Sequence, residues 1–224
     1  MLEMQHLEAG LADNEWVLRA GIVDACRRMN ALGINQGTSG NISARWKDGL
    51  LISPSGVDYA DLTPDQIVFI DYDGNYEGAI RPSSEWRFHA RITAAKPEVG
   101  SVVHTHATYC TTLAIRGMAI PAVHYMVAIA GGSDIPCVPY TTFGTPELAD
   151  MVVKALSDRT ACLLANHGMI ATGSDLRKAL WLAVEVETLA RQYFNSLLIG
   201  GPNLLSDQQI EATKRRFETY GQTK

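Results

Sequence analysis

The sequence lacks a long block of lysines and arginines. It has 19 lysines and arginines against 24 aspartates and glutamates, which gives a formal net charge of −5. Nucleic acids and anionic membranes attract proteins through basic surfaces, so neither is expected as a partner. A small anionic substrate remains compatible with this charge, because backbone N–H groups at turns and helix N-termini bind anions without lysine or arginine.

Signals for export, membrane insertion and disulfide formation are missing as well. No run of about 20 apolar residues occurs, and the first residues, MLEMQHLEAGLADNEW, lack the basic start and apolar core of a signal peptide. The cysteines have no CxxC spacing and lie among apolar neighbours, which is typical of buried free thiols in a reducing compartment. They are Cys26, Cys110, Cys137 and Cys162. We therefore expect a cytoplasmic protein.

Repeats, low-complexity tracts and Pro/Ser-rich linkers are also absent, so residues 1–224 are expected to form a single domain. The hydrophobic patterns alternate between helical and strand spacing. Helices are expected at 15–32, 83–96, from 145, 175–199 and 206–220, and strands at 41–45, 50–53, 66–70, 101–106 and 161–165. Several strands are joined by tight turns and must be antiparallel. The expected fold is α/β, with three α/β/α layers around a mixed, mostly antiparallel sheet.

Three histidines form the strongest chemical signal. His104 and His106 are two positions apart on an expected strand, so their side chains point to the same face and can converge on one metal. His167 follows another apolar strand and precedes Gly168, a usual place for a functional side chain. Three histidines and one open position are typical of catalytic zinc. The alternative is a pair of polar residues at a strand end. His89 is expected to be a packed or surface residue, not a ligand.

Three short segments offer hydroxyls and backbone N–H groups where the chain turns. They are Gly37-Thr38-Ser39-Gly40-Asn41, Ser53-Pro54-Ser55-Gly56 and Ser83-Ser84. Such groups can hold a phosphate, although each segment alone is also typical of a plain turn. Neither the P-loop nor the dinucleotide-binding glycine pattern is present.

Four motifs in this order resemble the class II aldolase/adducin family, and within it the L-fuculose-1-phosphate aldolases. They are Asn35-Gln36-Gly37-Thr38-Ser39-Gly40-Asn41, Pro82-Ser83-Ser84-Glu85-Trp86-Arg87-Phe88-His89, His104-Thr105-His106 and Asn166-His167-Gly168. The resemblance runs from about residue 35 to residue 220. It implies that His104, His106 and His167 bind one Zn²⁺ per subunit. It also implies that Glu85 is a zinc ligand in the resting enzyme and then the acid/base.

The resemblance implies further site residues and an assembly. The phosphate pocket would be formed by Thr38, Asn41, Ser55, Gly56, Ser83 and Ser84. Tyr125 would reach the active site of a neighbouring subunit, and Tyr220 would lie near it from the C-terminal end. The family's aldolases are homotetramers with active sites between subunits, so the same assembly is expected here.

The activity implied is zinc-dependent cleavage of a ketose 1-phosphate, L-fuculose 1-phosphate or a related 5-deoxyketose 1-phosphate, to dihydroxyacetone phosphate and an aldehyde. Alternatives are an aldolase or dehydratase of 5-methylthioribulose 1-phosphate, a ribulose-5-phosphate 4-epimerase, and a non-catalytic adducin-like interaction module. The epimerases carry Asp after the paired serines, so Glu85 favours the aldolase. The complete set of three histidines and a glutamate disfavours the non-catalytic module. The four motifs contain no lysine, so no Schiff base is expected.

Overall fold

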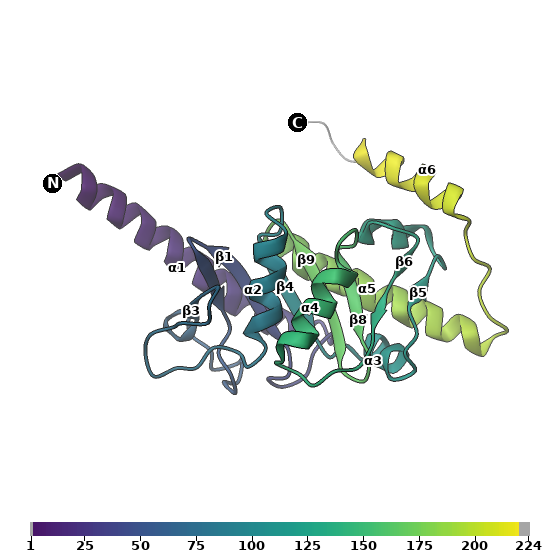
Figure 1. The fold of residues 1–224 in the computed structure, drawn as a ribbon, viewed down its shortest axis with the longest axis horizontal. Coiled ribbons are helices and arrows are strands. Elements are labelled where there is room, and N and C mark those ends of the chain that lie inside the picture. The colour runs from purple at the N-terminus through teal and green to yellow at the C-terminus, as the bar shows by residue number, and fades with distance from the viewer. Residues whose placement is uncertain (1, 220–224) are drawn as a thin grey trace.

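A mixed sheet of seven strands forms the centre of the molecule (Figure 1). The structure is a computed structural model that describes residues 2–219, with side chains from 14 to 217 and at 219. The strand order is β3-β2-β1-β4-β9-β8-β7. The strands are β1 (Asn41–Trp46), β2 (Gly49–Ile52), β3 (Val68–Asp71), β4 (Ser101–Thr105), β7 (Cys137–Val138), β8 (Ala161–Leu164) and β9 (Gly168–Gly173). Strands β7 and β8 are parallel and the other neighbours are antiparallel.

Helices cover both faces of this sheet, as the sequence predicted. One face packs against α1 (Leu2–Ala31), α3 (Thr108–Ile115) and α5 (Leu176–Leu198), and the other against α2 (Trp86–Ala95) and α4 (Pro146–Ala155). Neighbouring residues of β4 show why. Val103 packs in the first layer and Val102 in the second, and both are fully buried, because successive strand side chains point to opposite faces.

The remaining short strands and helices lie in the C-terminal half of the chain and next to β3. Strands β5 (Ile120–Pro121) and β6 (Asp134–Ile135) form a two-stranded sheet, and η1 (Pro64–Gln66) and η2 (Tyr125–Ala130) are short 3₁₀ helices. The last helix, α6 (Asp207–Glu218), packs against η2 (yellow in Figure 1). No helix within residues 2–219 has the length and apolar character required to span a bilayer.

Several predicted element boundaries were wrong. The expected helix 83–96 begins only at Trp86, because the N–H of Ser83 bonds to the carbonyl of Ser53 and holds this part of the chain extended. The strand expected at 66–70 begins at Val68, since Pro64 starts a 3₁₀ turn that includes Gln66. The helix expected at 15–32 starts at Leu2. The strand expected at 101–106 ends at Thr105, which leaves His106 beyond it.

The functional motifs meet at one end of the sheet. Strand β1 begins there, and its first residue, Asn41, pairs with His104 near the end of β4. Strand β9 begins there too, with Met169 paired to Thr105. An isolated antiparallel bridge between Pro54 and Pro82 brings the chain that leads into α2 to the same end. The antiparallel order therefore gathers segments that are far apart in the sequence.

Candidate metal centre and active site

The three predicted histidines and Glu85 converge at this end of the sheet. The Nε2 atoms of His104 and His106 are 3.1 Å apart. Glu85 Oε2 lies 3.2 Å from His104 Nε2, and Glu85 Oε1 lies 3.2 Å from His167 Nε2. Four ligand atoms about 2.0–2.1 Å from a tetrahedral zinc would be about 3.4 Å from one another. The spacing of these donor atoms fits a zinc-sized cation.

Hydrogen bonds behind His104 fix the orientation of its ring. His104 is fully buried in β4, and its Nδ1 lies 2.9 Å from the carbonyl oxygen of Met169 on β9. A carbonyl only accepts, so Nδ1 carries the hydrogen and the Nε2 lone pair points toward the other donors. Metal-binding histidines are usually held in this way.

His106 lies between the end of β4 and the start of α3. The N–H of the following residue, Ala107, donates to Thr105 Oγ1 at 3.2 Å. Ala107 is the N-cap of α3 and has no side chain that could cap it. Glu187 of α5 supplies the missing acceptor, because its two carboxylate oxygens accept from Tyr109 N and Cys110 N at 2.9 Å each. This carboxylate anchors the helix that follows His106.

His167 lies in a tight turn between β8 and β9. Asn166 has a positive φ of 55°, and the N–H of His167 donates to the carbonyl of Leu164 at 3.0 Å. A Cβ at Gly168 would lie 2.4 Å from the carbonyl oxygen of Thr105. Only glycine permits this close approach, which brings His167 toward the end of β4.

The charges at the site suit a cation. Burial alone would raise the pKa of Glu85, but the adjacent imidazoles of His104 and then His167 outweigh it and hold that pKa well below its usual range. Burial lowers the pKa of His106 to about 4, with the neighbouring histidines adding to the effect. An ionised carboxylate and neutral imidazoles are the forms that bind metals. Glu85 Oε1 is buried without a hydrogen-bond partner, and a bound cation would satisfy it.

A cavity of about 340 Å³ opens onto this centre. Glu85, His106 and His167 reach it, while His104 lies beneath. Its other lining residues are Ser39, Ser84, Tyr140, Thr141, Phe143 and Asn166. Tyr140, Thr141 and Phe143 were not singled out in the sequence. They follow β7, a strand of two residues whose pattern is too short to recognise.

Of the residues predicted to bind phosphate, Ser84 lines this cavity, whereas Thr38, Asn41, Ser55, Gly56 and Ser83 are not among its lining residues. The N–H of Ser55 donates to the carbonyl of Arg81, so the loop that contains Gly56 lies beside Ser83 and Ser84. Gly56 has a φ of 72°, which favours glycine. Thr38 is exposed on the loop before β1. The side chain of Asn41 is buried and contacts Glu85.

Of the two predicted tyrosines, Tyr125 lies away from this group in its own chain. Tyr125 belongs to η2 and lines a different groove of about 1090 Å³ with Trp181 and Phe217. Its ring centroid is 6.2 Å from that of Phe217. Tyr220 lies outside the described residues. His89 is fully buried, as expected for a packed residue.

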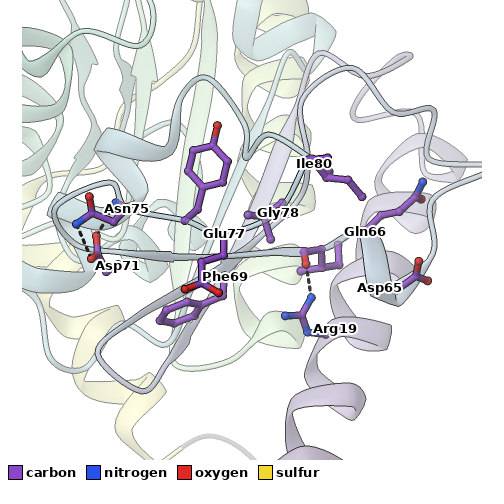
Figure 2. A pocket seen from close by; sticks show the side chains of 13 residues that line it. Arg19, Asp65, Gln66, Phe69, Asp71, Asn75, Glu77, Gly78 and Ile80 are labelled. Atoms are coloured by element: carbon purple, nitrogen blue, oxygen red, sulfur yellow. Dashed lines mark hydrogen bonds between the residues drawn. The ribbon is translucent and has the colours of Figure 1, made fainter.

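A further hollow lies beside the edge strand β3 and contains none of the predicted residues. It encloses about 530 Å³, and Figure 2 shows its lining. Arg19 donates to the backbone carbonyl of Ile67, and Asp71 accepts from Asn75. Among the described residues that line it there is no histidine or cysteine, so the histidine centre remains the candidate site.

Comparison with known proteins agrees with this geometry. A family model described as Class II Aldolase and Adducin N-terminal domain matches residues 20–194.

The chain belongs to the class II aldolase and adducin family.

Relatives of this aldolase share about half of its residues over most of its length. A 5-methylthioribulose-1-phosphate/5-deoxyribulose-1-phosphate aldolase from Rhodospirillum rubrum is 55% identical and covers 91% of this chain and 92% of its own. The L-fuculose phosphate aldolase of Escherichia coli strain K12 is 51% identical and covers 89% and 94%. A solved L-fuculose 1-phosphate aldolase superposes with a TM-score of 0.87 at 35% identity, covering 90% and 96%. The expected fold and the expected class of enzyme, an aldolase, are confirmed.

Proposed function

We propose that this aldolase cleaves a ketose 1-phosphate into dihydroxyacetone phosphate and an aldehyde, with one Zn²⁺ per subunit held by His104, His106 and His167. The observation that carries the proposal is the convergence of three imidazoles, whose ligand nitrogens lie within 4.8 Å of one another, with the Glu85 carboxylate oxygens 3.2 Å from His104 Nε2 and His167 Nε2. Relatives named for L-fuculose phosphate and for 5-methylthioribulose 1-phosphate support the substrate class.

The bond that breaks joins C3 and C4 of the ketose. When bound, Zn²⁺ supplies a Lewis acid that stabilises negative charge on the substrate oxygens. A base removes the proton of the C4 hydroxyl, and the C4 oxygen becomes the carbonyl oxygen of the aldehyde. The electron pair of the C3–C4 bond remains on the three-carbon fragment as an enediolate. Glu85 first takes up a proton equivalent to the one lost from the C4 hydroxyl and then delivers it to C3, and dihydroxyacetone phosphate is released. Proton transfer of this kind contributes about 10²–10⁴-fold.

The phosphate would be bound without lysine. Hydroxyls and backbone N–H groups of Thr38, Asn41, Ser55, Gly56, Ser83 and Ser84 would surround it. The bridge between Pro54 and Pro82, which places two of the three loops side by side, supports this pocket. Holding the phosphate end orients C3 toward Glu85, because Glu85 directly follows Ser84 in the chain.

The base is assigned to Tyr125 of a neighbouring subunit in a homotetramer, with Tyr220 close by. Tyr125 is 51% exposed and lies in the groove with Trp181 and Phe217, away from the cavity at Glu85. An exposed aromatic groove of this kind is suited to cover by another subunit. In this proposal residues 1–224 act as one cytoplasmic domain.

The two groups of relatives define the substrates to test. L-Fuculose 1-phosphate would yield lactaldehyde, 5-deoxyribulose 1-phosphate would yield acetaldehyde, and 5-methylthioribulose 1-phosphate would yield a methylthio aldehyde. Purified enzyme of measured zinc content should be assayed with each for release of dihydroxyacetone phosphate. Release from at least one, with about one zinc per chain, supports the proposal. Epimerisation or loss of water in place of cleavage would support the epimerase or dehydratase alternative instead.

A further inference from the structure

A buried chain of hydrogen bonds connects the protein core to Glu85. Ser43 Oγ lies 2.8 Å from His89 Nδ1, and His89 Nε2 lies 2.5 Å from Asn41 Oδ1. Asn41 Nδ2 in turn donates to Glu85 Oε2 at 3.0 Å. Ser43 and His89 are fully buried, and Asn41 and Glu85 are 4% and 5% exposed. The chain of bonds joins β1 to the first turns of α2.

The secondary structure explains how these side chains meet. Asn41 and Ser43 are two positions apart on β1, so both point to the same face of the sheet. His89 follows Glu85 by four positions in and beside α2, so the two lie one above the other on the helix face that packs against that sheet. The four residues therefore line one strip of the interface between α2 and the sheet.

The chemistry of the groups allows one arrangement of hydrogens. The ionised carboxylate of Glu85 only accepts, so Asn41 must present its NH₂ group and turn Oδ1 toward His89. His89 Nε2 must then carry the hydrogen, which leaves Nδ1 to accept from the hydroxyl of Ser43. Burial lowers the pKa of His89 to about 3, so the ring is neutral, as this arrangement requires.

We propose that His89 and Ser43 are positioning residues that lock the side-chain amide of Asn41, so that Glu85 Oε2 is held and Glu85 Oε1 is left to move the proton. This inference rests on the proposed aldolase function. Oε1 lies 3.2 Å from His167 Nε2 without accepting a hydrogen bond, whereas Oε2 accepts from the Asn41 amide. The two carboxylate oxygens of Glu85 therefore differ in their hydrogen bonding before any substrate binds.

Without the hydrogen bond from His89, the Asn41 amide could turn and place its oxygen against the Glu85 carboxylate, so that two acceptors would face each other. If the amide of Asn41 rotated by half a turn, Oδ1 would face Glu85 Oε2, and the carboxylate would have to move. A displacement of about 1 Å at a reacting group can cost about 10²-fold in rate. Removing a group that orients a metal ligand typically costs about 10–100-fold.

The experiment compares His89→Asn with the matched variant His89→Gln. Glutamine can place an N–H donor where His89 Nε2 lies, whereas asparagine keeps a polar group only opposite Ser43. The assay is exchange of the C3 hydrogen of dihydroxyacetone phosphate with D₂O, followed by proton NMR without any aldehyde, because this half-reaction uses Glu85 as the acid/base. Rates are expressed per bound zinc, and thermal stability is measured for each variant.

We expect His89→Asn to slow exchange about 10–100-fold with little change in the KM for dihydroxyacetone phosphate, and His89→Gln to stay within a few-fold of the native rate. Equal rates in all three proteins would overturn the positioning role. So would equal slowing in both variants, because a purely structural residue is not rescued by the correct donor. If the native enzyme itself neither exchanges nor cleaves, the proposed function fails instead.

A second measurement does not depend on how the variants fold. In native protein labelled with ¹⁵N-histidine, the ring nitrogen shifts of His89 report which nitrogen carries the hydrogen. The Nε2–H form supports the hydrogen-bond chain from Ser43 to Glu85. The Nδ1–H form or a charged ring would overturn it.

Discussion

Replacing Glu85 by glutamine tests the proposed reaction most directly. The substitution keeps the shape of a side chain that is almost completely buried. The glutamine oxygen can still accept from Asn41 Nδ2, as Glu85 Oε2 does at 3.0 Å. Its NH₂ group would then take the place of Oε1, 3.2 Å from His167 Nε2, where it can donate to the ring. The fold should therefore survive, while the group that carries the proton is lost.

The size of the effect follows from the role assigned. Loss of a positioned acid/base lowers the rate by about 10²–10⁴-fold. At about 1.36 kcal/mol for each tenfold, this is about 2.7–5.4 kcal/mol of transition-state stabilisation. The KM should change little, because the predicted phosphate residues remain. Since glutamine is neutral, zinc will bind less tightly, so the variant must be assayed at saturating zinc.

Turnover can be followed by coupling release of dihydroxyacetone phosphate to NADH oxidation by glycerol-3-phosphate dehydrogenase. Glu147→Gln is the matched control, because Glu147 is an exposed glutamate in the first turn of another helix, α4. It should retain native turnover. If zinc-loaded Glu85→Gln turned over at a near-native rate, the role given to Glu85 would be wrong.

Three further predictions concern the metal, the neighbouring subunit and the support of His106. A strong chelator should abolish activity, and added zinc should restore it. Borohydride with dihydroxyacetone phosphate should leave the enzyme active. Activity that survives the chelator and is lost with borohydride would indicate a lysine-dependent aldolase. Tyr125→Phe should lower kcat. Assemblies that mix Tyr125→Phe subunits with Glu85→Gln subunits should regain part of the activity, because some active sites then contain both an intact Tyr125 and an intact Glu85. No recovery in verified mixed assemblies would contradict a shared site. Glu187→Gln should weaken zinc binding about tenfold in a competition assay with a chromophoric chelator, because the start of α3 loses its anionic cap. Asp175→Asn, which alters a carboxylate cap at α5, should leave zinc affinity unchanged, and an equal loss in both variants would argue against the support of His106.

Much of the fold was predictable because its elements carry local patterns. Thr145 and Pro146 begin α4, Asp175 caps α5 and Ser206 caps α6, as their residue types indicate. Boundaries failed where a partner distant in sequence determined the backbone. A helix was expected to begin at Ser83, but the N–H of Ser83 donates to the carbonyl of Ser53, and no local pattern near Ser83 indicates that contact.

The candidate site was likewise predictable where local patterns determine it and unpredictable where contacts between distant elements do. The candidate ligands could be named in advance because spacing on a strand, a glycine turn and the resemblance each pointed to them. His89 was expected to be a packed or surface residue, but its contact with Asn41 was not expected, because that contact runs from α2 to β1. Glu187 likewise reaches α3 from another helix. Contacts of this kind depend on how elements pack.

The sequence by itself determined the kinds of donor groups, the order of the elements that carry them and the family. These depend on residue type, spacing and local turn chemistry, which are properties of neighbouring residues in the chain. Only the tertiary structure decided that the end of β4, the turn after β8 and the start of α2 meet at one point, with the histidine ligand atoms within 4.8 Å of one another and the carboxylate oxygens 3.2 Å from two of them. The physical reason is the antiparallel pairing of β1, β4 and β9 between two helical layers. That pairing brings segments that are distant in the sequence to the same edge.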